Sequence, residues 1–142
     1  MRLDGKVAIV TASTRGIGLA CTQRLAREGA IVYMAARNME RAENRAKELN
    51  DEGCNVKTVY NDATEKETYT SMVEEVFKNE GRIDILVNNF GTSNPQKDLD
   101  IKNTEYDEYI RTVAFHRAFC DARGIHGRSS QYFGYLACGR VL

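Results

Sequence analysis

The chain has 142 residues, the size of one domain, and its 20 basic and 20 acidic residues give a formal net charge of zero. This balance offers no electrostatic basis for binding nucleic acid or an anionic membrane. No apolar run is long enough to span a bilayer, and the first residues lack the apolar stretch of a signal peptide, so we expect a cytoplasmic protein. The four cysteines make no metal-ligand spacing with the two histidines, and we expect free thiols and no metal site.

Apolar runs of strand length alternate with segments of helical periodicity through the first 90 residues. We predict strands at residues 6–11, 30–36, 55–60 and 83–87, and helices at 16–28, 39–52 and 65–79. The first helix is expected to bury Ile17, Ala20, Cys21 and Leu25, and the third Met72, Val73, Val76 and Phe77. This order, with continuously apolar strands, predicts an α/β fold with a doubly wound parallel sheet. Its ligands are expected at the carboxyl ends of the strands.

A glycine-containing turn at residues 11–18 (Thr-Ala-Ser-Thr-Arg-Gly-Ile-Gly) lies directly between the first predicted strand and the first predicted helix. Glycines at such a turn allow a tight bend and close backbone approach. The start of the helix presents unpaired N–H groups and a partial positive charge, which suit a phosphate. The segment therefore predicts a seat for a nucleotide pyrophosphate.

The end of the second predicted strand carries Arg37 where a ribose-binding acidic residue would stand, and Arg15 projects from the turn. Two guanidinium groups suit a 2′-phosphate and favour NADP(H) over NAD(H). The alternative is a surface ion pair between Arg37 and Glu40.

Polar side chains also follow the third and fourth predicted strands. Asp62 is suited either to an adenine amino group or, like Thr64, to capping the next helix. Residues 88–91 (Asn-Asn-Phe-Gly) either brace the ribose of the coenzyme or form an ordinary Asn-Gly turn. We predict the following coenzyme-binding residues: Thr11, Ser13, Thr14, Arg15, Gly16, Ile17, Gly18, Arg37, Asn38, Asp62, Ala63, Asn88 and Gly91.

These segments together resemble the short-chain dehydrogenase/reductase family. Its glycine motif Thr-Gly-x-x-x-Gly-x-Gly corresponds to residues 11–18, its Asn-Asn-Ala-Gly motif to residues 88–91, and its adenine-contacting Asp to Asp62. Residues 67–73 and 89–92 are similar to bacterial 7α-hydroxysteroid dehydrogenases, which act on bile acids with NADP(H). The resemblance covers about residues 1–113 and implies a Rossmann-like fold, a small-molecule steroid substrate and, in intact relatives, a homo-oligomer.

The proton carrier of this family is a Tyr with a Lys four residues later, which lowers the phenol pKa. No Tyr-x-x-x-Lys stands anywhere in the sequence, and Ala12 and Phe90 replace a glycine and an alanine of the family motifs. We therefore assign no catalytic residue and expect coenzyme binding with negligible turnover. A non-catalytic nucleotide-binding remnant and a family reductase for another carbonyl, such as a 3-oxoacyl substrate, are the alternative functions.

The composition changes near residue 114. From there to residue 142 the chain has four arginines, one aspartate, no lysine and no glutamate. We predict the amino-terminal half of a Rossmann-like domain at 1–113, with a helix near residue 104, and a divergent tail at 114–142 read in another frame or otherwise replaced. A surface helix, loop and terminal strand of the same fold is the alternative for this tail. Residues 131–136 resemble a strand but are not expected to pair with the fourth strand. Its open edge then predicts low stability.

Overall fold

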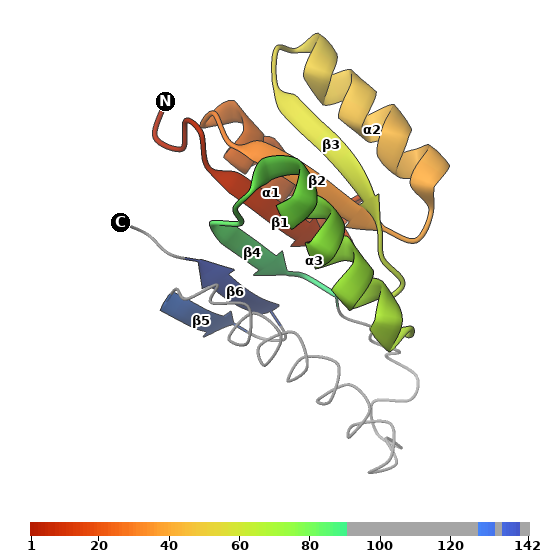
Figure 1. The fold of residues 1–142 in the computed structure, drawn as a ribbon. Coiled ribbons are helices and arrows are strands. Elements are labelled where there is room, and N and C mark those ends of the chain that lie inside the picture. Colours follow the sequence, from red (N-terminus) through yellow and green to blue (C-terminus); the bar gives the residue numbers. More distant parts are fainter. Residues whose placement is uncertain (91–127, 133–134, 140–142) are drawn as a thin grey trace.

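The computed structural model describes residues 1–90, 128–132 and 135–139 (Figure 1). Every helix and strand predicted before residue 90 is confirmed, with ends that differ by at most two residues. In chain order the elements are β1 (Val7–Thr11), α1 (Gly16–Arg27), β2 (Ile31–Ala36), α2 (Met39–Asp51), β3 (Asn55–Tyr60), α3 (Lys66–Glu80), β4 (Ile85–Asn88), β5 (Arg128–Tyr132) and β6 (Tyr135–Gly139).

One sheet contains all the strands, in the order β3-β2-β1-β4-β6-β5. The four strands β1 to β4 run parallel, and β1 pairs with β2 on one side and with β4 on the other. The carboxyl ends of these strands therefore meet at one edge of the sheet. The predicted doubly wound parallel sheet is confirmed for this part of the chain.

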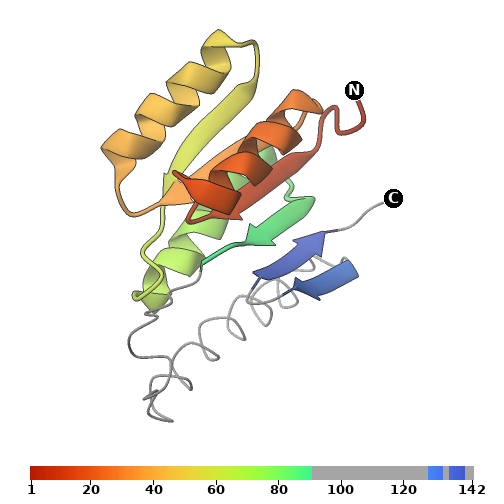
Figure 2. The ribbon, with the colours of Figure 1, turned by 180° about the vertical axis from the view of Figure 1, so that it is seen from behind.

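The helices cover both faces of the sheet. Figure 1 shows α3 in front, and Figure 2, seen from behind, shows α1 and α2 on the other face. Successive β1 residues alternate between the two faces, as strand geometry requires. Val7 and Ile9 pack with α3 residues such as Met72, whereas Ala8 and Val10 pack with the α1 and α2 side of the core. Both faces of β1 are thus buried, which explains its unbroken apolar sequence.

Three predicted core residues lie outside the core. Ala20 in α1 is exposed. Ile17 in α1 is 55% exposed and Phe77 in α3 is 53% exposed. The buried positions of α1 are Gly18, Thr22 and Ala26, at successive four-residue intervals, while the predicted Cys21 and Leu25 are partly buried against the core. Small side chains at these buried positions let the helix approach the sheet closely. Because Gly, Thr and Ala are not strongly hydrophobic, hydrophobicity alone does not reveal these positions. In α3 the buried stripe begins one turn earlier than predicted, at Tyr69.

The outer edge of β4 is paired, so the expectation of an open edge is wrong. Strand β6 runs antiparallel to β4, from the pair Ile85–Gly139 to the pair Asn88–Leu136. Strand β5 then pairs antiparallel with β6, and Tyr132 opposite Tyr135 leaves two residues between the strands. The prediction of a single strand at 131–136 is thus wrong, because these residues include the end of β5 and the start of β6.

Some expectations lie outside the described residues, including the helix near residue 104. No group of three or more His, Cys, Asp or Glu residues suited to a metal ion occurs in the described part of the chain. The helices described here are all too short or too polar to cross a membrane.

Candidate coenzyme-binding site

The turn that follows β1 has an unusual backbone. Ala12 has a φ of +49° and Gly16 a φ of +56°. A glycine adopts this left-handed conformation without steric cost, whereas an alanine does not. A Cβ built at Gly16 would meet no atom within 4 Å. The glycine is therefore needed for its conformation, and open space remains in front of the helix.

Gly18 is needed for a different reason, close packing. A Cβ there would lie 2.5 Å from the carbonyl oxygen of Ala12 and would also collide with Nδ2 of Asn89. That Nδ2 donates a 3.1 Å hydrogen bond to the same Ala12 carbonyl. The missing side chain thus lets α1, the turn and the end of β4 meet at one point.

The start of α1 has free capacity to bind an anion. Its N-cap residue, Arg15, makes no side-chain capping bond, and no acidic residue lies in the first turn. By contrast, Asn38 caps α2 by accepting from the N–H of Arg41 at 2.9 Å, and acidic residues lie in the first turns of α2 and α3. Among the three described helices, α1 alone combines an uncapped start with no negative charge, which suits a phosphate.

Thr11 joins the ends of β1 and β4 behind this turn. Its hydroxyl accepts hydrogen bonds from the backbone N–H groups of Asn89 (2.9 Å) and Phe90 (3.2 Å), and lies 3.3 Å from Oδ1 of Asn88. Asn88 is 3% exposed, and its Nδ2 has no hydrogen-bond partner within the part of the chain described. Buried amide donors are rarely left unpaired. This atom is therefore a candidate donor to a bound group at the strand ends.

Ser13 connects the turn to β2. The side chain is fully buried, and its hydroxyl donates to the carbonyl oxygen of Ala35 at 3.3 Å. The turn is thus tied to β2 as well as to β4. Thr14, next in the chain, is half-buried on the turn.

Arg15 and Arg37 are both exposed at this edge of the sheet. Neither forms an ion pair with another residue of the described segments, so the surface pair between Arg37 and Glu40 is not made. The positive charge of Arg37 does reach Asp62, where it contributes to a lowered pKa. The two guanidinium groups are therefore available to a ligand.

Asp62 lies at the end of β3, and its carboxylate is oriented by its neighbour. Oδ1 accepts from the N–H of Thr64 (2.9 Å) and from the Thr64 hydroxyl (2.7 Å). These bonds, the backbone one first, hold the pKa of Asp62 below its usual value against the opposing effect of burial. Neither residue is the N-cap of α3, which is Glu65.

The structure brings most of the predicted site residues to one edge of the sheet. The turn residues 11–18, Arg37, Asp62 and Asn88 follow the ends of β1, β2, β3 and β4. Asn38 lies there too, although its Oδ1 is engaged in capping α2. Ala63 is half-buried beside Asp62, and Gly91 lies outside the described residues.

Three further residues support the site, of which Asn89 belongs to the predicted segment 88–91 and the other two were not predicted. Asn89 fastens the turn through Ala12, and Thr68 and Tyr69 of α3 hold the loop around Asp62. Tyr69 had a signal in the sequence, because it precedes Met72, Val73 and Val76 at helical spacing. Asn89 had one too, since it stands in the Asn-Asn-Phe-Gly segment. Thr68 had none, because its bonds to Asn61 and Asp62 depend on how the loop folds.

Comparison with known proteins shows the family of the chain. Residues 6–118 match the family model of the short chain dehydrogenases. The chain is 54% identical over 112 residues to a 7alpha-hydroxysteroid dehydrogenase of Clostridium sardiniense, covering 79% of this chain and 43% of the relative. It is 48% identical over 115 residues to the enzyme of the same name from Paraclostridium sordellii, covering 81% and 43%.

Among solved structures, L-sorbose reductase of Gluconobacter frateurii, complexed with NADPH and L-sorbose, aligns with a TM-score of 0.72 and 31% identity. The alignment covers 83% of this chain and 48% of the reductase chain. The chain spans less than half the length of the two curated relatives named above. A match over more than three quarters of the chain, with the strand-turn-helix geometry in place, leads to one conclusion: the chain belongs to the short-chain dehydrogenase family.

Proposed function

We propose that this chain binds NADP(H) at the carboxyl edge of its parallel sheet. The start of α1, uncapped by a side chain and without an acidic residue, is the observation that carries the proposal, because it is suited to the pyrophosphate. Arg15 and Arg37, exposed and free of ion pairs within the described residues, would hold the 2′-phosphate. Asp62 and Ala63 would contact the adenine, and the unpaired Nδ2 of Asn88 would donate toward the ribose.

The remaining predicted residues have supporting roles in this proposal. Thr11, Ser13 and Gly18 hold the turn against β2 and β4, while Thr14, Gly16 and Ile17 form its outer side. Asn38 and Gly91 complete the predicted set at the ends of β2 and β4. No metal ion enters the proposal.

The substrate class that we propose is a hydroxysteroid such as a bile acid, oxidised at a 7α-hydroxyl. Support comes from the two relatives of that name and from the matching residues 67–73. When bound, the coenzyme supplies the hydride acceptor or donor of such a reaction. The 142 residues contain no Tyr-x-x-x-Lys to move the proton, so we propose that they bind coenzyme without appreciable turnover.

Two other functions fit the family. A nucleotide-binding protein without catalysis fits the missing proton carrier, and a reductase for another carbonyl fits relatives such as a 3-oxoacyl carrier-protein reductase of Haemophilus influenzae, 36% identical over 110 residues. The steroid oxidoreductase is preferred because identities of 54% and 48% belong to two hydroxysteroid enzymes, against 36% for this reductase.

Titration of the 142-residue chain with NADPH and with NADH, followed by nicotinamide fluorescence, tests the proposal. We expect saturable NADPH binding at least tenfold tighter than NADH binding, because one coenzyme alone carries the 2′-phosphate. Equal affinities would contradict the assignment of NADP(H), and absence of binding by folded protein would contradict the site itself. An assay of bile-acid oxidation that follows NADPH then tests the expectation of negligible turnover.

A further inference from the structure

The loop between β3 and α3 is fastened by side chains of the helix that follows it. Glu65, the N-cap of α3, makes no side-chain capping bond. Instead, the Thr68 hydroxyl accepts from the N–H of Asp62 (3.1 Å) and from Nδ2 of Asn61 (3.2 Å). The Tyr69 hydroxyl donates to the carbonyl oxygen of Ala63 at 3.1 Å. Side chains of α3 therefore hold the segment that carries Asp62, through its backbone groups and through the side chain of Asn61.

A single peptide group connects Tyr69 to the Asp62 carboxylate. Its oxygen, the carbonyl of Ala63, accepts the bond from Tyr69. Its N–H, which belongs to Thr64, donates to Oδ1 of Asp62 at 2.9 Å. Because a peptide group is planar, a bond that holds the C=O also holds the direction of the N–H. The bond to the carbonyl polarises the N–H as well, which strengthens the bond to the carboxylate.

We propose that Tyr69 is a positioning residue for the coenzyme site, whose hydroxyl sets the orientation of the Asp62 carboxylate through the Ala63–Thr64 peptide. The identity of the ligand rests on the proposed function, whereas the connection itself rests on the geometry. Both hydrogen bonds to the carboxylate fall on Oδ1, so within the described residues Oδ2 carries none. That oxygen would accept from the adenine amino group in the proposed complex.

Burial keeps Tyr69 a hydrogen-bond donor. The side chain is 2% exposed, and burial, followed by the negative charge of Asp62, raises the pKa of its phenol. The phenol therefore stays protonated at every pH at which the protein is used. Asp62 in turn has a lowered pKa, first because of the Thr64 N–H, then because of the Thr64 hydroxyl, with Arg37 at the end of β2 adding its charge. Weakening the N–H bond should raise this pKa.

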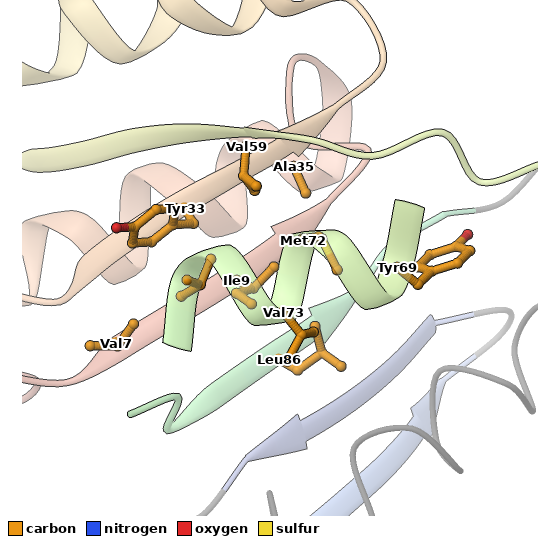
Figure 3. Close-up of a cluster of buried hydrophobic side chains, with 10 residues drawn as sticks. Val7, Ile9, Tyr33, Ala35, Val59, Tyr69, Met72, Val73 and Leu86 are labelled. Atoms are coloured by element: carbon orange, nitrogen blue, oxygen red, sulfur yellow. The ribbon is translucent and has the colours of Figure 1, made fainter. Parts of the chain in front are cut away.

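The chain offers a matched control. Tyr69→Phe and Tyr33→Phe each remove one phenolic hydroxyl from the same buried cluster, but the two side chains lie toward opposite ends of α3 (Figure 3). The Tyr33 hydroxyl donates to Oε1 of Glu80 at 2.7 Å, far along the helix from Asp62. A loss of core stability alone would affect both variants, whereas an effect on the carboxylate would appear only in Tyr69→Phe.

The experiment measures NADPH affinity by fluorescence titration and the pKa of the Asp62 carboxyl by carbon-13 NMR, in the full chain and in both variants. We expect Tyr69→Phe to weaken NADPH binding about fivefold and to raise the Asp62 pKa. Tyr33→Phe should leave the affinity within about twofold and the pKa unchanged. Unchanged affinity and unchanged Asp62 pKa in folded Tyr69→Phe would overturn the inference.

Failure of the proposed function can be told apart from failure of this inference. A wild-type chain that does not bind NADPH contradicts the function, while the NMR titration still decides whether Tyr69 acts on Asp62. Should Tyr69→Phe fail to fold, hydrogen exchange of the Thr64 amide in the wild type tests the connection instead. A protected Thr64 amide supports the connection, and a Thr64 amide that exchanges at the rate of an unstructured peptide contradicts it.

Discussion

The hydroxyl of Thr11 accepts a 2.9 Å hydrogen bond from the backbone N–H of Asn89, 78 positions later in the chain. It also accepts from the N–H of Phe90, and so joins the ends of β1 and β4 directly behind the proposed pyrophosphate seat. Thr11→Val keeps the shape but leaves two N–H groups without this acceptor. We expect the free energy of unfolding to fall by about 2–3 kcal/mol, measured by urea denaturation.

The control for this prediction is Thr58→Val. Thr58 is half-buried in β3, and its hydroxyl makes no hydrogen bond to another residue in the described segments. We expect a change of less than about 0.5 kcal/mol there. An equal loss in both variants would show that the effect comes from threonine replacement and not from the bonds at the strand ends.

Gly18→Ala and Gly16→Ala separate close packing from backbone conformation. At Gly18 the new methyl group would lie 2.5 Å from a backbone oxygen, and backbone cannot move aside cheaply. At Gly16 the methyl group meets nothing within 4 Å but is forced into a left-handed conformation. We expect losses of about 3 kcal/mol at Gly18 and about 1–2 kcal/mol at Gly16, from chemical denaturation. A larger loss at Gly16 would contradict the packing of the turn against β4.

Ala12→Gly is expected to stabilise the protein. Ala12 has a φ of +49°, which costs a residue with a Cβ about 1–2 kcal/mol relative to glycine. Part of this gain is lost, because glycine raises the conformational entropy of the unfolded chain and so lowers stability by about 0.4–1 kcal/mol. A net gain of about 0.5–1 kcal/mol should appear as a higher melting temperature. A lower one would mean that the left-handed turn is absent in solution.

Arg37→Ala tests the 2′-phosphate site without touching the turn. Because one charge-assisted hydrogen bond contributes about 1.5–3 kcal/mol, we expect NADPH affinity to fall by about 10- to 100-fold, with NADH affinity unchanged. Arg41→Ala, at an exposed position in the first turn of α2, is the control for the loss of one positive charge. Equal weakening of both coenzymes by Arg37→Ala would contradict its role.

Acid should weaken the protein partly through Glu80. Hydrogen bonds from Lys57 and then from Tyr33 hold the pKa of Glu80 below its usual value. A lowered pKa stabilises the fold above the unfolded-state pKa, near 4.3, and this stabilisation is lost as the pH falls through the folded-state pKa. Glu80→Gln should therefore cost about 1 kcal/mol at pH 7 and almost nothing at pH 3, measured by urea denaturation at both values.

The partner for comparison is Glu75→Gln, at an exposed position on the same helix. The free energy of unfolding of Glu75→Gln should equal that of the wild type at both pH values. A constant deficit of Glu80→Gln from pH 7 to pH 3 would mean that the charge of Glu80 is not what Lys57 and Tyr33 stabilise.

The sheet and the location of the site were predictable because they depend on local patterns. Apolar runs and helical periodicity located β1 to β4 and the three helices, and residues after strand ends necessarily meet at one edge of a parallel sheet. The buried face of α1 was less predictable. The buried positions of this helix are small residues, Gly18, Thr22 and Ala26, which allow close packing on the sheet. The more hydrophobic Ile17 is exposed.

The partner of β4 could not be predicted, because strand pairing depends on which edge is free and not on the strand itself. Residues 131–136 gave one weak signal where the structure has the end of β5 and the start of β6. Tyr69 was likewise recognisable as a core residue from its spacing, but not as a donor to the Ala63 carbonyl. Such a bond depends on how the preceding loop folds back over the helix.

The residues themselves determined that this is an α/β chain of the short-chain dehydrogenase family with a glycine-containing turn after its first strand. Hydrophobic periodicity, glycine placement and charge are local properties, and they are legible without coordinates. Only the tertiary structure decided which polar groups are engaged: Thr11 with Asn89, Ser13 with Ala35, and Tyr69, through one peptide, with Asp62. These bonds join segments brought together by packing, and hydrogen-bond geometry exists only once the packing is complete.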